Sequence, residues 1–158
     1  MILDEICYAN RMFTGFISGR IVDSLIIGVI CFAGMLLLGI PNRMLVSVIT
    51  GVTNVIPFFG PYIGAIPSFL LILMVSPAKA VEFLIFILIL QQFDGNILGP
   101  RILGNKTGLS SFWVLFSILL FGGLFGFVGM IIGVPVFAVI YDILRKLVNK
   151  GVAYQETK

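Results

Sequence analysis

The sequence predicts an all-α integral membrane protein that crosses the bilayer several times. Of its 158 residues, 59% are hydrophobic and only 11% are charged, whereas soluble domains average roughly 45–50% apolar and about 25% charged residues. A soluble fold could not bury so much apolar surface, so lipid must be the solvent for much of the chain. Prolines and glycines also interrupt the longest apolar stretches. Simple spanning helices would not need these interruptions.

Residues 1–19 are expected to form an amphipathic N-terminal segment that lies against the membrane or another domain. Apolar residues alternate there with Asp4, Glu5, Asn10 and Arg11. The first long apolar run begins only after Arg20, so this segment does not read as a signal peptide.

Residues 20–78 are predicted to hold one span and one broken hairpin. Residues 21–40 would measure about 30 Å as a helix, enough to cross the hydrocarbon layer. Residues 44–75 are too long for one span, and in "IPFFGP" Pro57 and Pro61 remove backbone donors and disfavour helix. Each half would reach only about 20 Å as a helix. We therefore expect these halves to form a re-entrant hairpin.

Residues 79–148 are predicted to repeat this order. Residues 80–98 are long enough to span, and they carry the polar stretch "QQFDGN" near their end. Residues 112–144 are again too long for one crossing and contain "FGGLFGFVG" followed by Pro135. A second re-entrant hairpin is expected there. Residues 149–158 are expected to be a cytoplasmic tail.

Short matches between the two parts suggest an inverted repeat. "RIVDSLI" aligns with "KAVEFLI", and "GPYIGAIP" aligns with "GMIIGVP" when one residue is dropped. A span plus a re-entrant hairpin makes one net crossing, so the second copy would be inverted relative to the first. Basic residues then concentrate on one side, which favours a multi-pass protein of the cell membrane with both termini in the cytoplasm.

The broken segments are the predicted substrate path. Unpaired backbone groups are costly in hydrocarbon and survive only against protein or a water-filled cavity. In transporters with inverted repeats, paired interruptions of this kind mark the substrate or ion site. The alternative is that the glycines serve close helix packing. The predicted path residues are Asn54, Pro57, Gly60, Pro61, Gly64, Gln92, Asp94, Asn96, Gly122, Gly123, Gly126, Gly129 and Pro135.

Three acidic residues are candidates for a proton or ion relay: Asp94, Asp23 and Glu82. An ionisable side chain within an apolar segment is costly unless it faces a cavity or a partner. The alternative is simple ion pairing, with Arg20 beside Asp23, Lys79 beside Glu82, and Arg101 near Asp94.

Other functional classes have little support. The chain has no histidine, and its two cysteines are far apart, so no metal site, disulfide or cofactor is expected. No basic run suggests nucleic acid, and no convincing nucleotide-binding motif is present. Without histidine, a serine nucleophile would lack its usual base, so we do not expect an enzyme.

The motifs together resemble the autoinducer-2 exporter family of bacterial and archaeal membrane proteins. The family has an I-P-x-x-G-P-x-I-G motif, a Q-x-x-x-N-x-x-x-P-x-x-x-G stretch, a G-G-x-x-x-G-x-x-G run and a proline in the last helix. In this sequence the matching residues are Ile56, Pro57, Gly60, Pro61, Ile63 and Gly64; Gln92, Asn96, Pro100 and Gly104; Gly122, Gly123, Gly126 and Gly129; and Pro135.

The resemblance implies a permease that exports a small solute, such as the signalling molecule autoinducer-2, or exchanges a monovalent cation for protons. It also implies a homo-oligomer in the lipid bilayer, with a pentamer among the expected states. We expect the path to lie between the two broken hairpins. Family members are usually about twice as long as this chain, so the alternatives are a truncated, transport-incompetent member or an oligomeric membrane scaffold.

Overall fold

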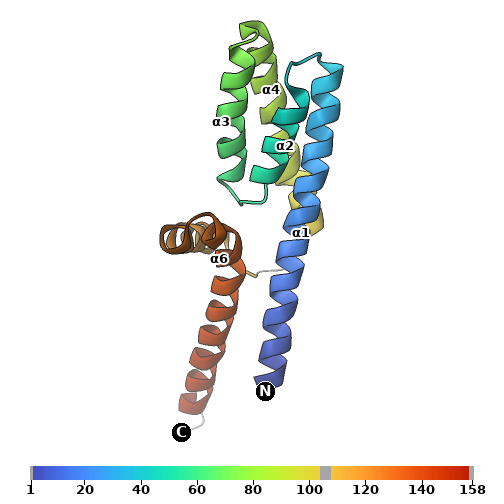
Figure 1. Cartoon of the computed structure of the whole chain (residues 1–158). Coiled ribbons are helices and arrows are strands. Elements are labelled where there is room, and N and C mark those ends of the chain that lie inside the picture. The colour runs from blue at the N-terminus through green and yellow to red at the C-terminus, as the bar shows by residue number, and fades with distance from the viewer. Residues whose placement is uncertain (1, 104–107, 157–158) are drawn as a thin grey trace. The chain divides into compact units, whose positions relative to one another are not determined.

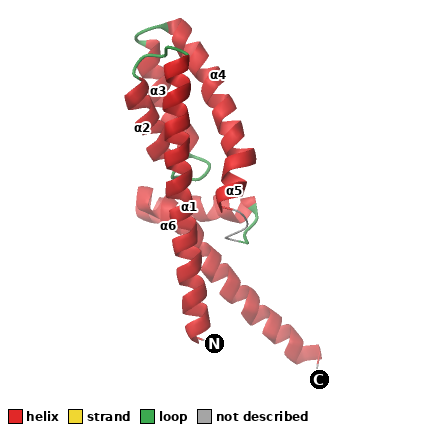
Figure 2. Cartoon of the chain, turned by 90° about the vertical axis from the view of Figure 1, so that its right-hand side faces the viewer, coloured by secondary structure: helices red, strands yellow, loops and turns green. Residues whose placement is uncertain are grey.

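Every regular element that the structure describes is a helix (Figure 1). The computed structural model describes residues 2–103 and 108–156, and loops and turns join the helices within those ranges (Figure 2). The predicted all-α fold is therefore confirmed. The elements are α1 (Ile2–Leu37), α2 (Arg43–Thr53), α3 (Gly60–Leu73), α4 (Pro77–Phe93), the π-helix η1 (Asp94–Leu98), α5 (Gly99–Leu103) and α6 (Ser111–Glu156).

Three stretches are long and apolar enough to cross a bilayer, namely Ile6–Leu37, Pro77–Leu103 and Ser111–Asn149. Only 28%, 22% and 17% of their most apolar windows are buried within the protein. Most of their apolar side chains therefore face outward, where lipid would cover them. This pattern agrees with the predicted multi-pass membrane protein.

The helices group into two compact units, residues 17–104 and residues 1–16 with 105–158. In the first unit, α1 to α4 lie side by side and run alternately in opposite directions (Figures 1 and 2). Their inward faces form one apolar core. Its fully buried members include Ile27, Met35, Val46, Ile72 and Phe83.

The loops at one end of this unit are tied together by polar contacts. The Lys79 ammonium donates to the carbonyl oxygen of Leu38 at 2.8 Å, which satisfies an acceptor near the end of α1. Ser76 caps α4 by accepting from the Lys79 backbone N–H, and Pro77 occupies the first turn. The start of α4 therefore contacts the end of α1.

α1 continues unbroken through the boundary expected near residue 20. The predicted amphipathic segment and the first predicted span thus belong to one helix. Its interior contains glycines but no proline. A glycine costs only about 1 kcal/mol in a helix, and tertiary packing can offset that cost.

α2 and α3 form a pair of short helices joined by residues 54–59. A Cβ atom at Gly60 would overlap the carbonyl oxygen of Thr53, and one at Gly64 would overlap the Thr53 hydroxyl. The two arms therefore touch along their glycines. Whether this pair enters and leaves the membrane on the same side stays a prediction.

α6 bends sharply at Gly126, whose backbone is non-helical with φ 62° and ψ −141°. The arms on either side fold against each other: the Trp113 ring stacks on Phe137, with 5.6 Å between ring centroids. Nearer the bend, a Cβ atom at Gly129 would overlap the carbonyl oxygen of Phe121. The element is thus a helical hairpin, and its re-entrant character stays a prediction.

Candidate functional site

Three buried polar side chains meet inside the unit formed by residues 17–104. The Asn54 side-chain amide donates to Asp23 Oδ2 at 3.3 Å and to Asp94 Oδ2 at 3.1 Å. Asp23 is fully buried, and Asn54 and Asp94 are 2% and 7% exposed. We call these three residues the acid–amide cluster. Each comes from a different element, so the tertiary fold alone assembles it.

Close contact between α1 and α2 brings Asp23 and Asn54 together. A Cβ atom added at Gly51 would lie 3.2 Å from the Cα of Gly28, and one at Gly28 would lie 3.5 Å from the Cα of Gly51. The two backbones therefore nearly touch about one turn away from the cluster. Larger side chains at this crossing would separate the helices.

The ends of two helices position the amide and the second acid. Asn54 directly follows α2, and its backbone N–H still donates to the Thr50 carbonyl at 3.1 Å. Asp94 is the first residue of η1, where α4 widens into π-helical geometry. Single π-helical turns are frequent at functional sites because they redirect side chains and alter the backbone hydrogen bonding.

Arg20 supplies a positive charge to the cluster. Its guanidinium Nη1 lies 3.6 Å from Asp23 Oδ2, one helical turn away on α1. The cluster therefore combines two acids with this one guanidinium. If both acids are ionised, these three side chains carry an excess of one negative charge.

Two buried polar atoms of the cluster have no hydrogen-bond partner among the described residues. They are the second carboxylate oxygens, Asp23 Oδ1 and Asp94 Oδ1. Buried acceptors without partners are costly. They mark a place where a proton, a cation or water would lower the free energy.

Other predicted polar residues lie elsewhere on the first unit. Glu82 pairs with Lys79 at 2.7 Å, and its side chain is 44% exposed, as the ion-pair alternative expected. Asn96 is exposed and donates to the Gln92 side chain at 3.0 Å and to its carbonyl at 2.9 Å. These residues are not among the partners of the acid–amide cluster.

The predicted prolines and glycines mostly shape the two hairpins. Pro57 is buried in the turn between α2 and α3, and Pro61 lies in the first turn of α3. Gly122 faces Met130 across the α6 hairpin, whereas nothing lies within 4 Å of a Cβ at Gly123. Pro135 lies inside α6, and Gly104 of the family pattern lies outside the described residues.

The sequence pointed to all three members of the acid–amide cluster but did not place them together. It did not indicate Gly28 or Gly51, at which α1 and α2 approach each other closely. No group of three or more His, Cys, Asp or Glu side chains that could hold a metal ion occurs in the described part of the chain.

Comparison with known proteins identifies the family. The family model described as "AI-2E family transporter" matches residues 5–149, nearly the whole chain. The chain belongs to the AI-2E transporter family. The family resemblance expected from the motifs is therefore confirmed.

Individual relatives of this AI-2E family chain agree with that assignment. The "Putative transport protein YueF" of Bacillus subtilis is 35% identical over 85% of this chain and 36% of its own length. The "Putative transport protein YrrI" of the same species is 39% identical over 79% of this chain and 35% of its own length. The "Putative permease PerM" of Escherichia coli is 28% identical over 86% of this chain and 39% of its own length.

The chain thus spans about a third of the length of the curated relatives it matches. No solved structure matches it.

Proposed function

We propose that this chain forms part of a membrane transporter and that the acid–amide cluster is its ion or proton site. The observation that carries the proposal is the pair of buried acids, Asp23 and Asp94, that share one amide donor from Asn54. Acidic residues within membrane segments are rare and commonly mark ion pathways or proton relays. Family membership supports the same class of function.

The charge and the free oxygens of the cluster favour a monovalent ligand. A proton or one monovalent cation would balance the single excess negative charge. Asp23 Oδ1 and Asp94 Oδ1 would act as its acceptors or ligands. Oxygen donors are the type that hard cations prefer.

We propose two transport activities and rank them. The first is exchange of a monovalent cation for protons, because the two buried carboxylates of the acid–amide cluster could bind either ion. The second is export of a small solute such as autoinducer-2, for which the family description is the support. In either case, the path between the two broken hairpins stays a prediction.

The second candidate function is an oligomeric membrane scaffold, or a transport-incompetent form. The evidence for this alternative is the packing of three glycines. Gly60, Gly64 and Gly129 each lie against the opposite arm of their own hairpin. Such contacts explain these glycines by packing alone.

Cation-driven proton flux tests the leading proposal. The purified chain would be reconstituted in liposomes loaded with a pH-sensitive dye, and a sodium or potassium gradient would be imposed. We expect Asp23→Asn and Asp94→Asn each to lower the initial flux at least ten-fold while the protein stays folded. Glu82→Gln is the matched control, because Glu82 is ion-paired and exposed, and it should stay within two-fold of wild type.

Two results would count against the proposal. Full flux in both folded aspartate variants would remove the cluster from the mechanism. A folded wild-type chain that moves neither cations nor autoinducer-2 would favour the scaffold or transport-incompetent alternative.

A further inference from the structure

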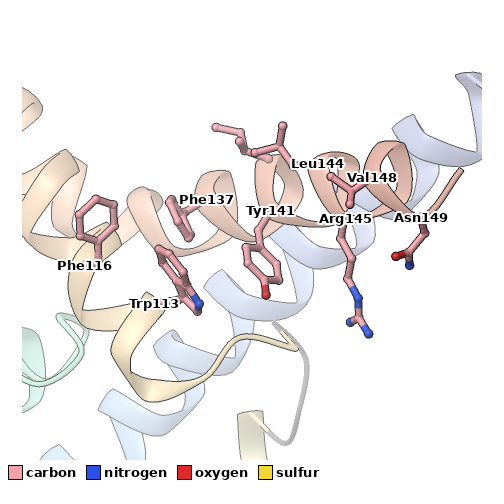
Figure 3. Close-up of a pocket in the computed structure, with 9 residues that line it drawn as sticks. Trp113, Phe116, Phe137, Tyr141, Leu144, Arg145, Val148 and Asn149 are labelled. Atoms are coloured by element: carbon pink, nitrogen blue, oxygen red, sulfur yellow. The ribbon is translucent and has the colours of Figure 1, made fainter. Parts of the chain in front are cut away.

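A cavity of about 440 Å³ lies along α6 and is lined by side chains from both of its arms (Figure 3). Its size falls within the range of pockets that hold small molecules, roughly 300–1,000 Å³. Neither the family assignment nor the proposed ion site accounts for it.

Aromatic rings form the apolar floor of this cavity. Trp113 stacks on Phe137 with 5.6 Å between ring centroids, and Tyr141 lies 5.7 Å from the Trp113 ring. Phe116 packs edge-on against both Trp113 and Phe137. The rings support one another across the hairpin, so the surface is preformed rather than assembled by a ligand.

One end of the cavity is polar and positively charged. Arg145 and Asn149 follow Tyr141 at successive turns of α6 and point to the same side (Figure 3). The neighbouring Lys146 is neutralised by Asp142 at 2.6 Å, whereas no carboxylate among the described residues pairs with Arg145. The Arg145 guanidinium and the Asn149 amide both offer hydrogen-bond donors that an anion could accept.

The composition of this region is typical of the boundary between hydrocarbon and water. Arg145, Lys146 and Lys150 follow the last apolar stretch of the chain. Tryptophan and tyrosine are enriched at that depth because their rings are apolar and their N–H and O–H groups are polar. An aromatic floor with a cationic end is therefore suited to the depth at which lipid headgroups meet acyl chains.

We propose that this cavity binds one anionic phospholipid of the surrounding bilayer. The headgroup phosphate would accept hydrogen bonds from Arg145 and Asn149, and an acyl chain would run over Phe116 and Phe137. A zwitterionic lipid has the same phosphate but carries an ammonium group that the guanidinium would repel. The site should therefore prefer phosphatidylglycerol to phosphatidylcholine.

Trp113 provides the test because it is the only tryptophan in the sequence. Its fluorescence would be measured in mixed micelles that contain phosphatidylglycerol or phosphatidylcholine with dibrominated acyl chains, which quench on contact. We expect phosphatidylglycerol to reach half-maximal quenching at an about five-fold lower mole fraction, the preference that one basic residue gives near an anionic lipid.

Two variants separate this site from general attraction to charge. Arg145→Gln should abolish the preference, whereas Lys146→Gln removes the same charge next to the cavity and should retain it. Arg145→Lys should keep most of the preference, which guards against a loss caused by misfolding. The assay measures lipid contact and requires no transport, so its result does not depend on whether the proposed ion site is correct.

Equal quenching by the two lipids in the wild type would overturn the proposal, as would a preference that survives in Arg145→Gln. Weak quenching by both lipids would also overturn it, because a second copy of the chain or another protein would then cover the rings.

Discussion

Asn54 and Asp94 lie 40 residues apart in the chain and meet through a 3.1 Å hydrogen bond from the Asn54 amide to Asp94 Oδ2. The bond joins the end of α2 to the point where α4 changes into a π-helix. The same amide nitrogen also reaches Asp23 on α1. One side-chain amide therefore links three helical elements, and its removal should affect both stability and function.

Replacing Asn54 with leucine should destabilise the protein and stop flux. The change removes the side-chain amide that donates to the buried carboxylates of Asp23 and Asp94. An unsatisfied buried acceptor costs about 1–3 kcal/mol. We expect a loss of that order in the free energy of unfolding, measured from denaturation in mixed micelles, together with loss of cation-driven proton flux in liposomes.

Asn96→Leu is the control for this change, because Asn96 is exposed and bonds only within its own helical turn to Gln92. It should alter the free energy of unfolding by less than about 0.5 kcal/mol, as surface substitutions commonly do. If Asn54→Leu lowered neither the free energy of unfolding nor the flux, the buried network would not contribute to transport and the scaffold alternative would gain support.

Replacing Gly51 with valine should separate α1 from α2 and disturb the acid–amide cluster. Its Cβ would lie 3.2 Å from backbone atoms of Gly28 and Ser24, and backbone cannot rotate away as a side chain can. Overpacking of this kind costs about 1–3 kcal/mol. Because Gly51 makes none of the cluster's hydrogen bonds, a parallel loss of flux would show that helix spacing positions Asp23 and Asn54.

Gly123→Val is the matched control, since nothing lies within 4 Å of a Cβ at Gly123. It should reproduce the change in side-chain size without the clash. Equal losses in the free energy of unfolding for the two valine variants would mean that the contact between Gly28 and Gly51 does not determine the positions of Asp23 and Asn54.

The bend in α6 should depend on Gly126. Its combination of φ 62° and ψ −141° is essentially restricted to glycine. Alanine at this position should therefore lower the free energy of unfolding by about 1–3 kcal/mol. The Trp113 emission spectrum should change as well, because opening the bend would separate Trp113 from Phe137.

Gly123→Ala, three residues away on the same arm, provides the comparison. Its Cβ would meet open space, so the better helix propensity of alanine should stabilise the protein by about 0.5–1 kcal/mol. If alanine were equally harmless at both positions, the backbone at residue 126 would be regular helix in the folded protein.

Local signals in the sequence predicted most of the helices and the interruptions near residues 57 and 126, but not the π-helix η1 or the helix α5. Pro57 lies in the turn between α2 and α3, Pro61 lies in the first turn of α3, and the glycine-rich run contains the bend at Gly126. By contrast, the continuity of α1 through residue 20 was not foreseen. A mixed polar and apolar composition does not stop a helix unless a proline, a cap or competing packing does so.

The candidate site was only partly predictable. Asp23, Asn54 and Asp94 are each polar residues in apolar surroundings. No local pattern shows that the Asn54 amide bonds to both acids, because Asp23 precedes it by 31 positions and Asp94 follows it by 40. That contact depends on how closely α1 approaches α2 and on where α4 widens into η1. Both are consequences of tertiary packing. The sequence around Glu82 also resembles that around Asp23, although Glu82 is exposed and ion-paired.

The re-entrant hairpins can be tested by cysteine accessibility at their two bends. Phe58 and Phe125 are exposed aromatic residues at the two bends, 49% and 64% accessible, so a single cysteine at either position should keep the fold. Cys7 would first be replaced by serine because it is exposed, whereas the buried Cys31 can stay and should not react. An impermeant thiol reagent would then be applied to sealed vesicles from each side. If the hairpins are re-entrant and inverted, each bend should label from one side only and the two sides should be opposite. Labelling of both bends from the same side would contradict the inverted arrangement, because two such hairpins would then share one orientation.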